Sequence, residues 1–119
     1  MNIVCFTKNR PLQFRAALES FFFYTDFRTQ KDKFYVITPE VNELYKPILN
    51  QFPVTIIEDR GNFDKVFRNL INSLNSNEFV TGYCDDQIIT RFFKFDHAER
   101  YLSNNLDTIG FSFRLGLLS

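Results

Sequence analysis

Two short clusters of charged residues stand out because each directly follows an apolar run of the kind that forms a buried strand. Asp85 and Asp86 follow one such run, and Lys8 and Arg10 follow another. A hard divalent cation such as Mg²⁺ or Mn²⁺ is typically held by one or two carboxylates together with phosphate oxygens of a substrate. The aspartates are therefore candidate metal ligands, and the two basic residues are candidate partners for a diphosphate.

Each cluster also has an ordinary structural interpretation. Adjacent aspartates are common in solvated turns and helix caps, and basic side chains in a loop are often simply solvated. Asn9, between the two basic residues, is a typical turn residue. Position favours a functional role, because α/β proteins bind ligands just beyond the carboxyl ends of their strands.

Other chemistries have weaker support. The 4 glycines form neither a GxGxxG nor a Walker motif, which argues against a P-loop or a dinucleotide-binding site. The 2 cysteines, Cys5 and Cys84, lie in apolar runs without CxxC or metal-ligand spacing, so we expect them to be small buried residues. His97 is expected on a helix surface, which leaves a cysteine nucleophile without a positioned base.

Apolar patterns predict the elements that must position the charged clusters. Short apolar runs predict buried strands over 3–6, 34–37, 54–57 and 79–83. Apolar residues at helical spacing predict helices over 11–24, 41–52, 63–74 and about 95–105. Pro11 suits the first turn of the first helix, whereas Pro47 should kink the second or end it early. A late strand is predicted by the alternation of Ile109, Phe111, Phe113 and Leu115 with Gly110, Ser112, Arg114 and Gly116.

Length and composition indicate one folded domain. The chain has 119 residues, of which 45% are hydrophobic and 18% aromatic, whereas disordered chains have low hydrophobicity. This length fits one core, so we expect a single domain over residues 1–119. The 14 basic and 14 acidic residues cancel, which argues against binding to nucleic acid or an anionic membrane. Since no transmembrane segment or signal peptide is recognisable, a cytoplasmic location is expected.

Strands that alternate with helices predict an α/β fold in three layers, α/β/α, around a mostly parallel sheet. Right-handed crossovers, with a return to the other side of the first strand, give the sheet order 3-2-1-4 plus the late strand. Ligands in such sheets bind where the strand order reverses. That point lies between the first and fourth strands, so the loops over 7–10 and 84–87 should face each other across a cleft.

Several segments, taken in order, resemble the GT-A fold of nucleotide-sugar glycosyltransferases, particularly the family-two-like group. They are Thr7-Lys8-Asn9-Arg10-Pro11, similar to the family's Asn-Arg-Pro nucleotide loop, the helix from Gly61 to Arg68-Asn69, Asn77-Glu78-Phe79-Val80 leading into Asp85-Asp86, and Gly110-Phe111-Ser112-Phe113-Arg114-Leu115-Gly116. Together they span nearly all of the chain, and their order is more specific than any one of them.

The resemblance implies roles for individual residues. In this family an Asp-x-Asp motif binds the metal and the nucleotide diphosphate, and its last Asp is commonly the metal ligand. Aligning the motif with Cys84-Asp85-Asp86 makes Asp86 the ligand of Mg²⁺ or Mn²⁺ and places Asp85 at the ribose or behind the metal ligand. The other register, Asp85-Asp86-Gln87, ends in a weaker neutral ligand. The further nucleotide contacts are Thr7, Lys8, Asn9 and Arg10, with Glu58 or Asp59 at the base.

The implied function is that of a glycosyltransferase, or its donor-binding part. It would move a sugar from a nucleotide-diphosphate sugar to an unknown sugar, lipid or protein acceptor, with a divalent metal as cofactor. The family's acceptor lobe and general base have no match, so the domain is expected to be incomplete at its C-terminus, and no catalytic residue is assigned.

Two alternatives remain open. One is a catalytically inactive nucleotide-binding or protein-interaction remnant of the same fold. The other is a nucleotidyltransferase or another metal-dependent phosphoryl enzyme on a similar sheet. Because an unfinished core would expose phenylalanines, a homo-oligomer is also expected.

Overall fold

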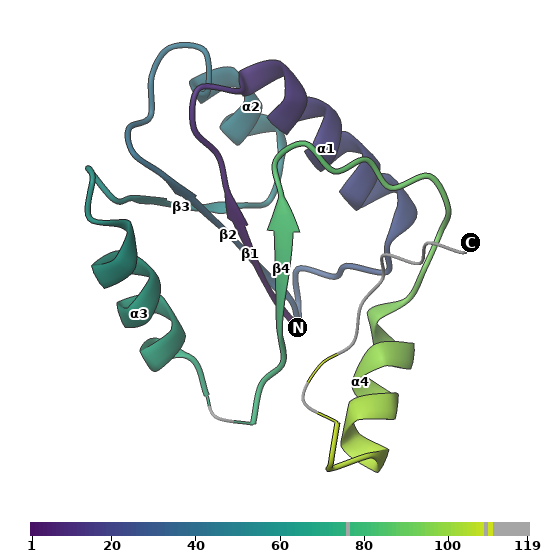
Figure 1. The fold of residues 1–119 in the computed structure, drawn as a ribbon. Helices are drawn as coiled ribbons and strands as arrows, with labels where there is room; N and C mark the ends of the chain where they lie inside the picture. Colours follow the sequence, from purple (N-terminus) through teal and green to yellow (C-terminus); the bar gives the residue numbers. More distant parts are fainter. Residues whose placement is uncertain (76, 109, 111–119) are drawn as a thin grey trace.

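Strands and helices alternate along the chain in the computed structural model, which describes residues 1–75, 77–108 and 110 (Figure 1). The strands are β1 (Asn2–Phe6), β2 (Lys33–Thr38), β3 (Thr55–Glu58) and β4 (Val80–Cys84). The helices are α1 (Pro11–Tyr24), α2 (Lys46–Gln51), α3 (Phe63–Ser73) and α4 (Phe95–Asn104). None of these helices is long and apolar enough to cross a membrane.

The four strands form one parallel sheet in the order β3-β2-β1-β4. The predicted order is therefore confirmed. The reversal lies between β1 and β4, because β1 pairs with β2 on one edge and with β4 on the other. The predicted late strand over 109–115 lies outside the described residues, apart from Gly110.

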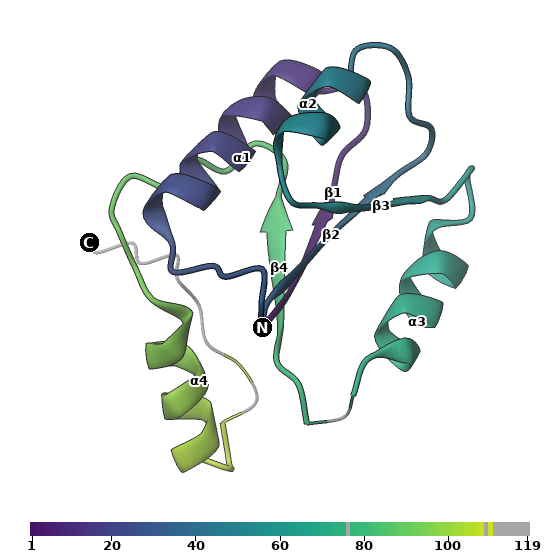
Figure 2. The ribbon, with the colours of Figure 1, turned by 180° about the vertical axis from the view of Figure 1, so that it is seen from behind.

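Helices cover both faces of the sheet, so the predicted three-layer arrangement is confirmed. Figures 1 and 2 show α1 and α2 on one face and α3 on the other. Alternate residues of β1 face opposite layers, so Ile3 and Cys5 join the core around α1, whereas Val4 joins the core around α3. The core around α1, which has more buried residues, also contains Phe95 from the start of α4.

The second helix is shorter than its apolar spacing predicts. The prediction of a helix over 41–52 is wrong in extent, because α2 begins only at Lys46 and Pro47 lies in its first turn. Proline suits that position, since the first N–H groups of a helix have no intrahelical acceptor. Pro47 therefore lies at the start of the helix, and the prediction that it kinks the helix or ends it early is wrong. The segment before it forms a turn in which Asn42 Oδ1 accepts hydrogen bonds from the backbone N of Leu44 (3.0 Å) and of Tyr45 (3.3 Å).

Among the residues that the structure describes, none of the core around α3 comes from β4, and the α3 face of the sheet is open there. Val80, Gly82 and Cys84 stand opposite the β1 residues of that face, and all three are exposed. The prediction that Cys84 is buried is therefore wrong, because the core around α3 draws its members from β1, β2, β3 and α3 and leaves β4 out. Cys5, on the opposite face, is buried as predicted, and this burial raises the pKa of its thiol.

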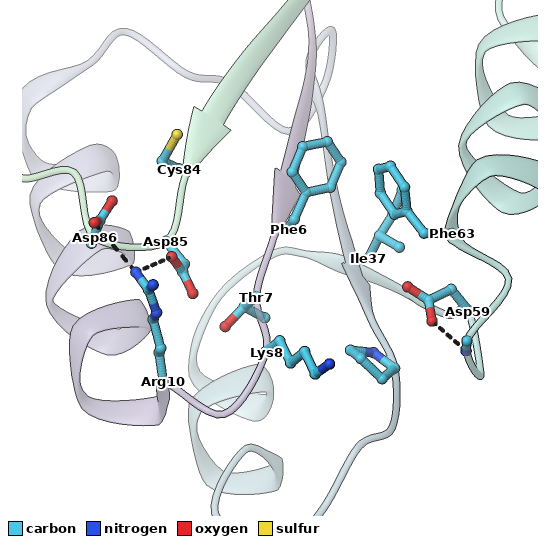
Figure 3. A pocket seen from close by; sticks show the side chains of 12 residues that line it. Phe6, Thr7, Lys8, Arg10, Ile37, Asp59, Phe63, Cys84, Asp85 and Asp86 are labelled. Atoms are coloured by element: carbon cyan, nitrogen blue, oxygen red, sulfur yellow. Dashed lines mark hydrogen bonds and ion pairs between the residues drawn. The ribbon is translucent and has the colours of Figure 1, made fainter.

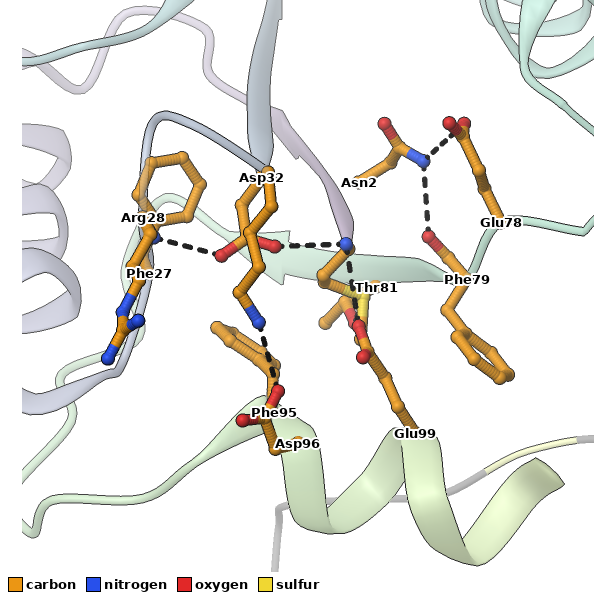
Figure 4. A network of polar contacts seen from close by, with 12 residues as sticks. Asn2, Phe27, Arg28, Asp32, Glu78, Phe79, Thr81, Phe95, Asp96 and Glu99 are labelled. Carbon is orange, nitrogen blue, oxygen red and sulfur yellow. Dashed lines mark hydrogen bonds and ion pairs between the residues drawn. The ribbon is translucent and has the colours of Figure 1, made fainter. Parts of the chain in front are cut away.

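A network of charged groups closes the amino-terminal end of the sheet (Figure 4). The Met1 ammonium lies 3.0 Å from Asp32 Oδ1 and 3.4 Å from Glu99 Oε1 of α4. Asp32 is buried, and this pairing offsets the cost of removing its charge from water. Lys31 Nζ also lies 2.9 Å from Asp96 Oδ1, at the surface. These ion pairs hold α4 at the end of the sheet opposite the charged loops.

Candidate functional site

A cavity of about 720 Å³ lies at the carboxyl ends of the strands, between the loops that follow β1 and β4 (Figure 3). This is the position that the strand order predicts. The charged residues that line it are Lys8, Arg10, Asp59, Asp85 and Asp86. Its apolar lining includes Phe6, Ile37, Pro39 and Phe63. The structure therefore brings the two predicted charged clusters to one cavity.

The loop after β1 is held in place by the hydroxyl of Tyr45. The backbone N of Arg10 donates a hydrogen bond to Tyr45 Oη (2.8 Å), and Tyr45 Oη lies 2.9 Å from the hydroxyl of buried Thr7. Asn9 adopts a φ of 56°, a left-handed conformation that asparagine tolerates better than most residues. The backbone of this loop is thus fixed, while Lys8 and Arg10 are exposed at its surface.

The acidic turn after β4 is fixed by Gln87. The side-chain Oε1 of Gln87 accepts a hydrogen bond from the backbone N of Cys84 (2.9 Å). The backbone carbonyl of Gln87 accepts a second hydrogen bond from Tyr83 Oη (2.7 Å). Within this turn Asp85 is nearly buried, whereas the side chain of Asp86 is 55% exposed. The two adjacent carboxylates are therefore held by one turn but differ in their access to solvent.

Arg10 connects the two loops across the cavity. Its Nη1 lies 3.6 Å from Asp85 Oδ1 and 3.3 Å from Asp86 Oδ2 (Figure 3). One guanidinium nitrogen thus serves both carboxylates. The positive charge of Arg10 compensates one of the two carboxylate charges at this end of the cavity. Lys8 adds a further cation to the lining.

The other end of the cavity is aromatic and carries one carboxylate. The rings of Phe6 and Phe63 meet edge to face with centroids 4.7 Å apart, beside Ile37 (Figure 3). Asp59 is buried, and its Oδ1 accepts a hydrogen bond from the backbone N of Gly61 (2.8 Å). Gly61 has a φ of +89°, which favours glycine at this position. The cavity therefore has an apolar end and a charged end.

Two of the predicted nucleotide contacts lie outside this lining. Glu58 Oε2 lies 3.2 Å from Arg60 Nη2, and Glu58 is not among the residues that line the cavity. Asn9 lines a smaller hollow of about 140 Å³ beside Thr38 and Glu40. The alternative interpretation of Asn9 as a turn residue is consistent with its positive φ.

The sequence pattern does not reveal the roles of Tyr45 and of the aromatic lining. Tyr45 lies in an apolar stripe at helical spacing, which predicts a core residue, and it is indeed buried. Phe6 and Phe63 likewise follow only the pattern of their strand and helix. The tyrosine within this apolar stripe is the one usable signal, because a buried hydroxyl needs a hydrogen-bond partner. His97 is exposed on α4, as predicted.

The fit of a metal ion depends on two carboxylates. Among the described residues, no group of three or more His, Cys, Asp or Glu side chains could hold a metal. Mg²⁺ and Mn²⁺ can be held by one or two carboxylates when phosphate oxygens and waters complete the coordination. Asp85 and Asp86 suit that arrangement, whereas the amide oxygen of Gln87 is already used inside the turn. The residues therefore fit a metal that arrives with a phosphate-bearing ligand.

Comparisons with known proteins support the fold of the chain. No known protein family matches the sequence, and no curated protein matches it. Among solved structures, the crystal structure of S. aureus TarS, a glycosyltransferase, matches with a TM-score of 0.64 at 15% sequence identity. The match covers 88% of this chain and 20% of the TarS chain. This chain thus shares its α/β fold with part of a glycosyltransferase.

Proposed function

We propose that the chain binds a nucleotide-diphosphate sugar in this cavity and serves the metal-dependent transfer of the sugar to an acceptor. One observation carries the proposal. Lys8 and Arg10 on one loop and Asp85 and Asp86 on another line the same cavity, at the point where the strand order reverses. Basic side chains suit the diphosphate, and the carboxylates suit its divalent counter-ion.

Asp86 is the proposed metal ligand, because it is the more exposed of the two carboxylates. Asp85 would support this metal ligand without binding the metal itself, or it would contact the ribose. When bound, a divalent ion would stabilise the charge that develops on the departing nucleoside diphosphate. The protein's own contribution is to position the donor. Lys8 and Arg10 would bind the phosphates, on a loop whose backbone Tyr45 holds in place.

The nucleobase is assigned to the aromatic end of the cavity. Phe6 and Phe63 offer ring surface there, and Asp59 lies in the same lining. A carboxylate can accept several hydrogen bonds, so Asp59 could receive one from the base in addition to that from Gly61. Of the two acidic residues predicted at the base, we therefore favour Asp59 over Glu58. The hydroxyl of Thr7 serves mainly to anchor the loop through Tyr45.

A second candidate is a nucleotide-binding module without catalysis. The ion pairs of Arg10 favour it, because they already compensate one of the two carboxylate charges without a metal ion. Such a module would bind nucleotides through Lys8 and Asp59 whether or not a metal is present. Metal dependence therefore separates the two candidates.

Calorimetric titration of UDP and of GDP, each with and without Mn²⁺, tests the proposal. We expect binding that requires Mn²⁺ and is lost in Asp86→Ala. Asp64→Ala removes an exposed carboxylate of α3 outside the cavity lining and should leave binding unchanged. Equal binding with and without Mn²⁺ would support the non-catalytic module, and no binding by the folded protein would exclude both.

Product analysis tests the reaction type. With a UDP-sugar and Mn²⁺, glycosyl transfer or slow hydrolysis releases UDP. When pyrophosphate is added, a nucleotidyltransferase would instead transfer the uridylyl group to it and release UTP and a sugar phosphate. Release of UDP that Asp86→Ala abolishes would support the proposed activity, and release of a sugar phosphate would contradict it.

A further inference from the structure

We infer that Arg10 holds the place of the metal ion at Asp86, next to Asp85, and that a diphosphate draws its side chain away. Metal and nucleotide should therefore bind cooperatively. This inference deepens the proposed function and rests on it. It concerns the coupling between metal binding and nucleotide binding, which neither the fold nor the lining of the cavity specifies.

The first observation is the sharing of one nitrogen by two carboxylates. Arg10 Nη1 lies within 3.6 Å of Asp85 Oδ1 and 3.3 Å of Asp86 Oδ2. Asp85 is nearly buried, and a buried carboxylate is costly without a cationic or hydrogen-bonding partner. Arg10 meets this need in the structure, and the same nitrogen lies against Asp86, the proposed metal ligand.

The second observation is that the side chain can leave without the backbone. The backbone N of Arg10 is hydrogen-bonded to Tyr45 Oη (2.8 Å), and its carbonyl accepts a hydrogen bond from Phe14 N (2.9 Å) in the first turn of α1. The side chain itself is 51% exposed. Rotation about its side-chain bonds can thus move the guanidinium from the carboxylates into the cavity while the loop stays anchored.

A diphosphate supplies the reason to move. Guanidinium groups bind phosphate oxygens through paired, charge-assisted hydrogen bonds. Two cations cannot share the space beside Asp86 without repulsion, so a metal and Arg10 compete for it. Once Arg10 turns to the phosphates, the carboxylate of Asp86 becomes available to the metal. By linkage, the nucleotide then raises the affinity for the metal as much as the metal raises the affinity for the nucleotide.

Lys8 provides a matched control. It lines the same cavity and carries the same charge, but it makes no ion pair with any described residue. Removing Lys8 changes the net charge of the cavity without releasing either carboxylate. A difference between the Lys8 and Arg10 variants therefore reports the specific contacts of Arg10.

The test measures Mn²⁺ binding without nucleotide, from the paramagnetic resonance signal of free Mn²⁺. We expect Arg10→Ala to bind Mn²⁺ about fivefold more tightly than the wild type, the change that about 1 kcal/mol of lost ion pairing would produce. Lys8→Ala should gain less than about twofold. Adding Asp86→Ala to Arg10→Ala should abolish the gain. Arg10→Gln, which keeps a long polar side chain, gives a second variant if Arg10→Ala does not fold.

Adding UDP completes the test. UDP should raise the Mn²⁺ affinity of the wild type more than that of Arg10→Ala, because the variant has no guanidinium to displace. Unchanged or weaker Mn²⁺ binding by the folded Arg10 variants, or an equal gain in Lys8→Ala, would overturn the inference. A gain in Arg10→Ala with no effect of UDP on either protein would confirm that Arg10 competes with the metal, but it would contradict both the coupling to a diphosphate and the proposed function.

Discussion

The two faces of the sheet differ in how deeply their core side chains are buried. On the α1 face, the ring of Phe21 is buried and packs against five aromatic rings of the described residues. On the α3 face, the buried members of the core are Val4, Ile37 and Leu70, and the aromatic rings around them are only partly buried. The α1 face therefore carries most of the stability of the described part of the chain. The cavity takes its apolar lining from the less densely packed face.

The difference starts in the helices. Helix α1 buries Phe14, Ala17, Leu18 and Phe21. Helix α3 has a regular apolar stripe, but it buries only Leu70 fully, and its other side is polar. A helix of this kind covers one strip of a sheet, so β4 is left open on that face. Phe6 remains 41% exposed at the border and lines the cavity.

The strongest test of the comparison removes one ring from each face. Phe21→Ala should lower the free energy of unfolding by about 3–5 kcal/mol, the usual loss for a buried phenylalanine. Phe67→Ala, on the α3 face, should cost roughly half as much, because its ring is only partly buried. Urea unfolding followed by circular dichroism measures both. Equal losses would show that the two faces contribute alike.

Tyr83 tests whether the α1 face also fixes the acidic turn. Its hydroxyl lies 3.0 Å from the carbonyl of Ala17 in α1 and 2.7 Å from that of Gln87. Tyr83→Phe should cost about 1–2 kcal/mol in urea unfolding, since these acceptors lose a buried donor. It should also weaken Mn²⁺–UDP binding. An unchanged affinity would indicate that the turn is held without Tyr83.

The raised pKa of Tyr83 predicts that the free energy of unfolding depends on pH. Burial raises the pKa of Tyr83 to about 12 from an ordinary value of 10.0. Since the folded state favours the neutral phenol, this stabilisation is complete below pH 10.0 and is lost as the pH rises toward 12. Urea midpoints at increasing alkaline pH should fall more steeply for the wild type than for Tyr83→Phe. Parallel curves would contradict the assignment.

A smaller effect compares two valines on the α3 face. Val4 is 1% exposed under α3, whereas Val80 is 45% exposed on uncovered β4. Val4→Thr should cost about 1 kcal/mol, because a hydroxyl enters an apolar layer. Val80→Thr should change the free energy of unfolding by less than about 0.5 kcal/mol. A large loss from Val80→Thr would mean that β4 is covered in solution, for instance in a homo-oligomer.

The smallest expected effect lies at the surface, in the pair that joins Lys31 to α4. The hydrogen bond from Lys31 lowers the pKa of Asp96, and the bond to Asp96 raises the pKa of Lys31. The lowered pKa means that the contribution of Asp96 is present at neutral pH and is lost as the pH falls through the folded-state pKa. Thermal unfolding between neutral and acidic pH should show a slightly weaker acid dependence in Asp96→Asn. An identical dependence would show that the pair contributes nothing measurable.

Much of the fold could be predicted because each element has a local cause. Pro11 starts α1 as expected, and the apolar stripe of α3 predicts its bounds to within one residue. The second helix was harder, because Pro47 is compatible with either a kink or a start, and only the packing of the preceding turn decides between them. The exposure of Cys84 could not be predicted, since its neighbours in sequence are apolar and what matters is how far α3 reaches.

For the candidate site, the order of residues along the chain shows which side chains follow the strands and therefore gather at the carboxyl edge of a parallel sheet. How these side chains meet depends on long-range packing. Arg10 and Asp86 are 76 residues apart, and their contact depends on the pairing of β4 with β1. The hydroxyl of Tyr45 reaches the loop after β1 only because α2 packs on the same face as α1. Such contacts are set by the packing of whole elements, and no local pattern encodes them.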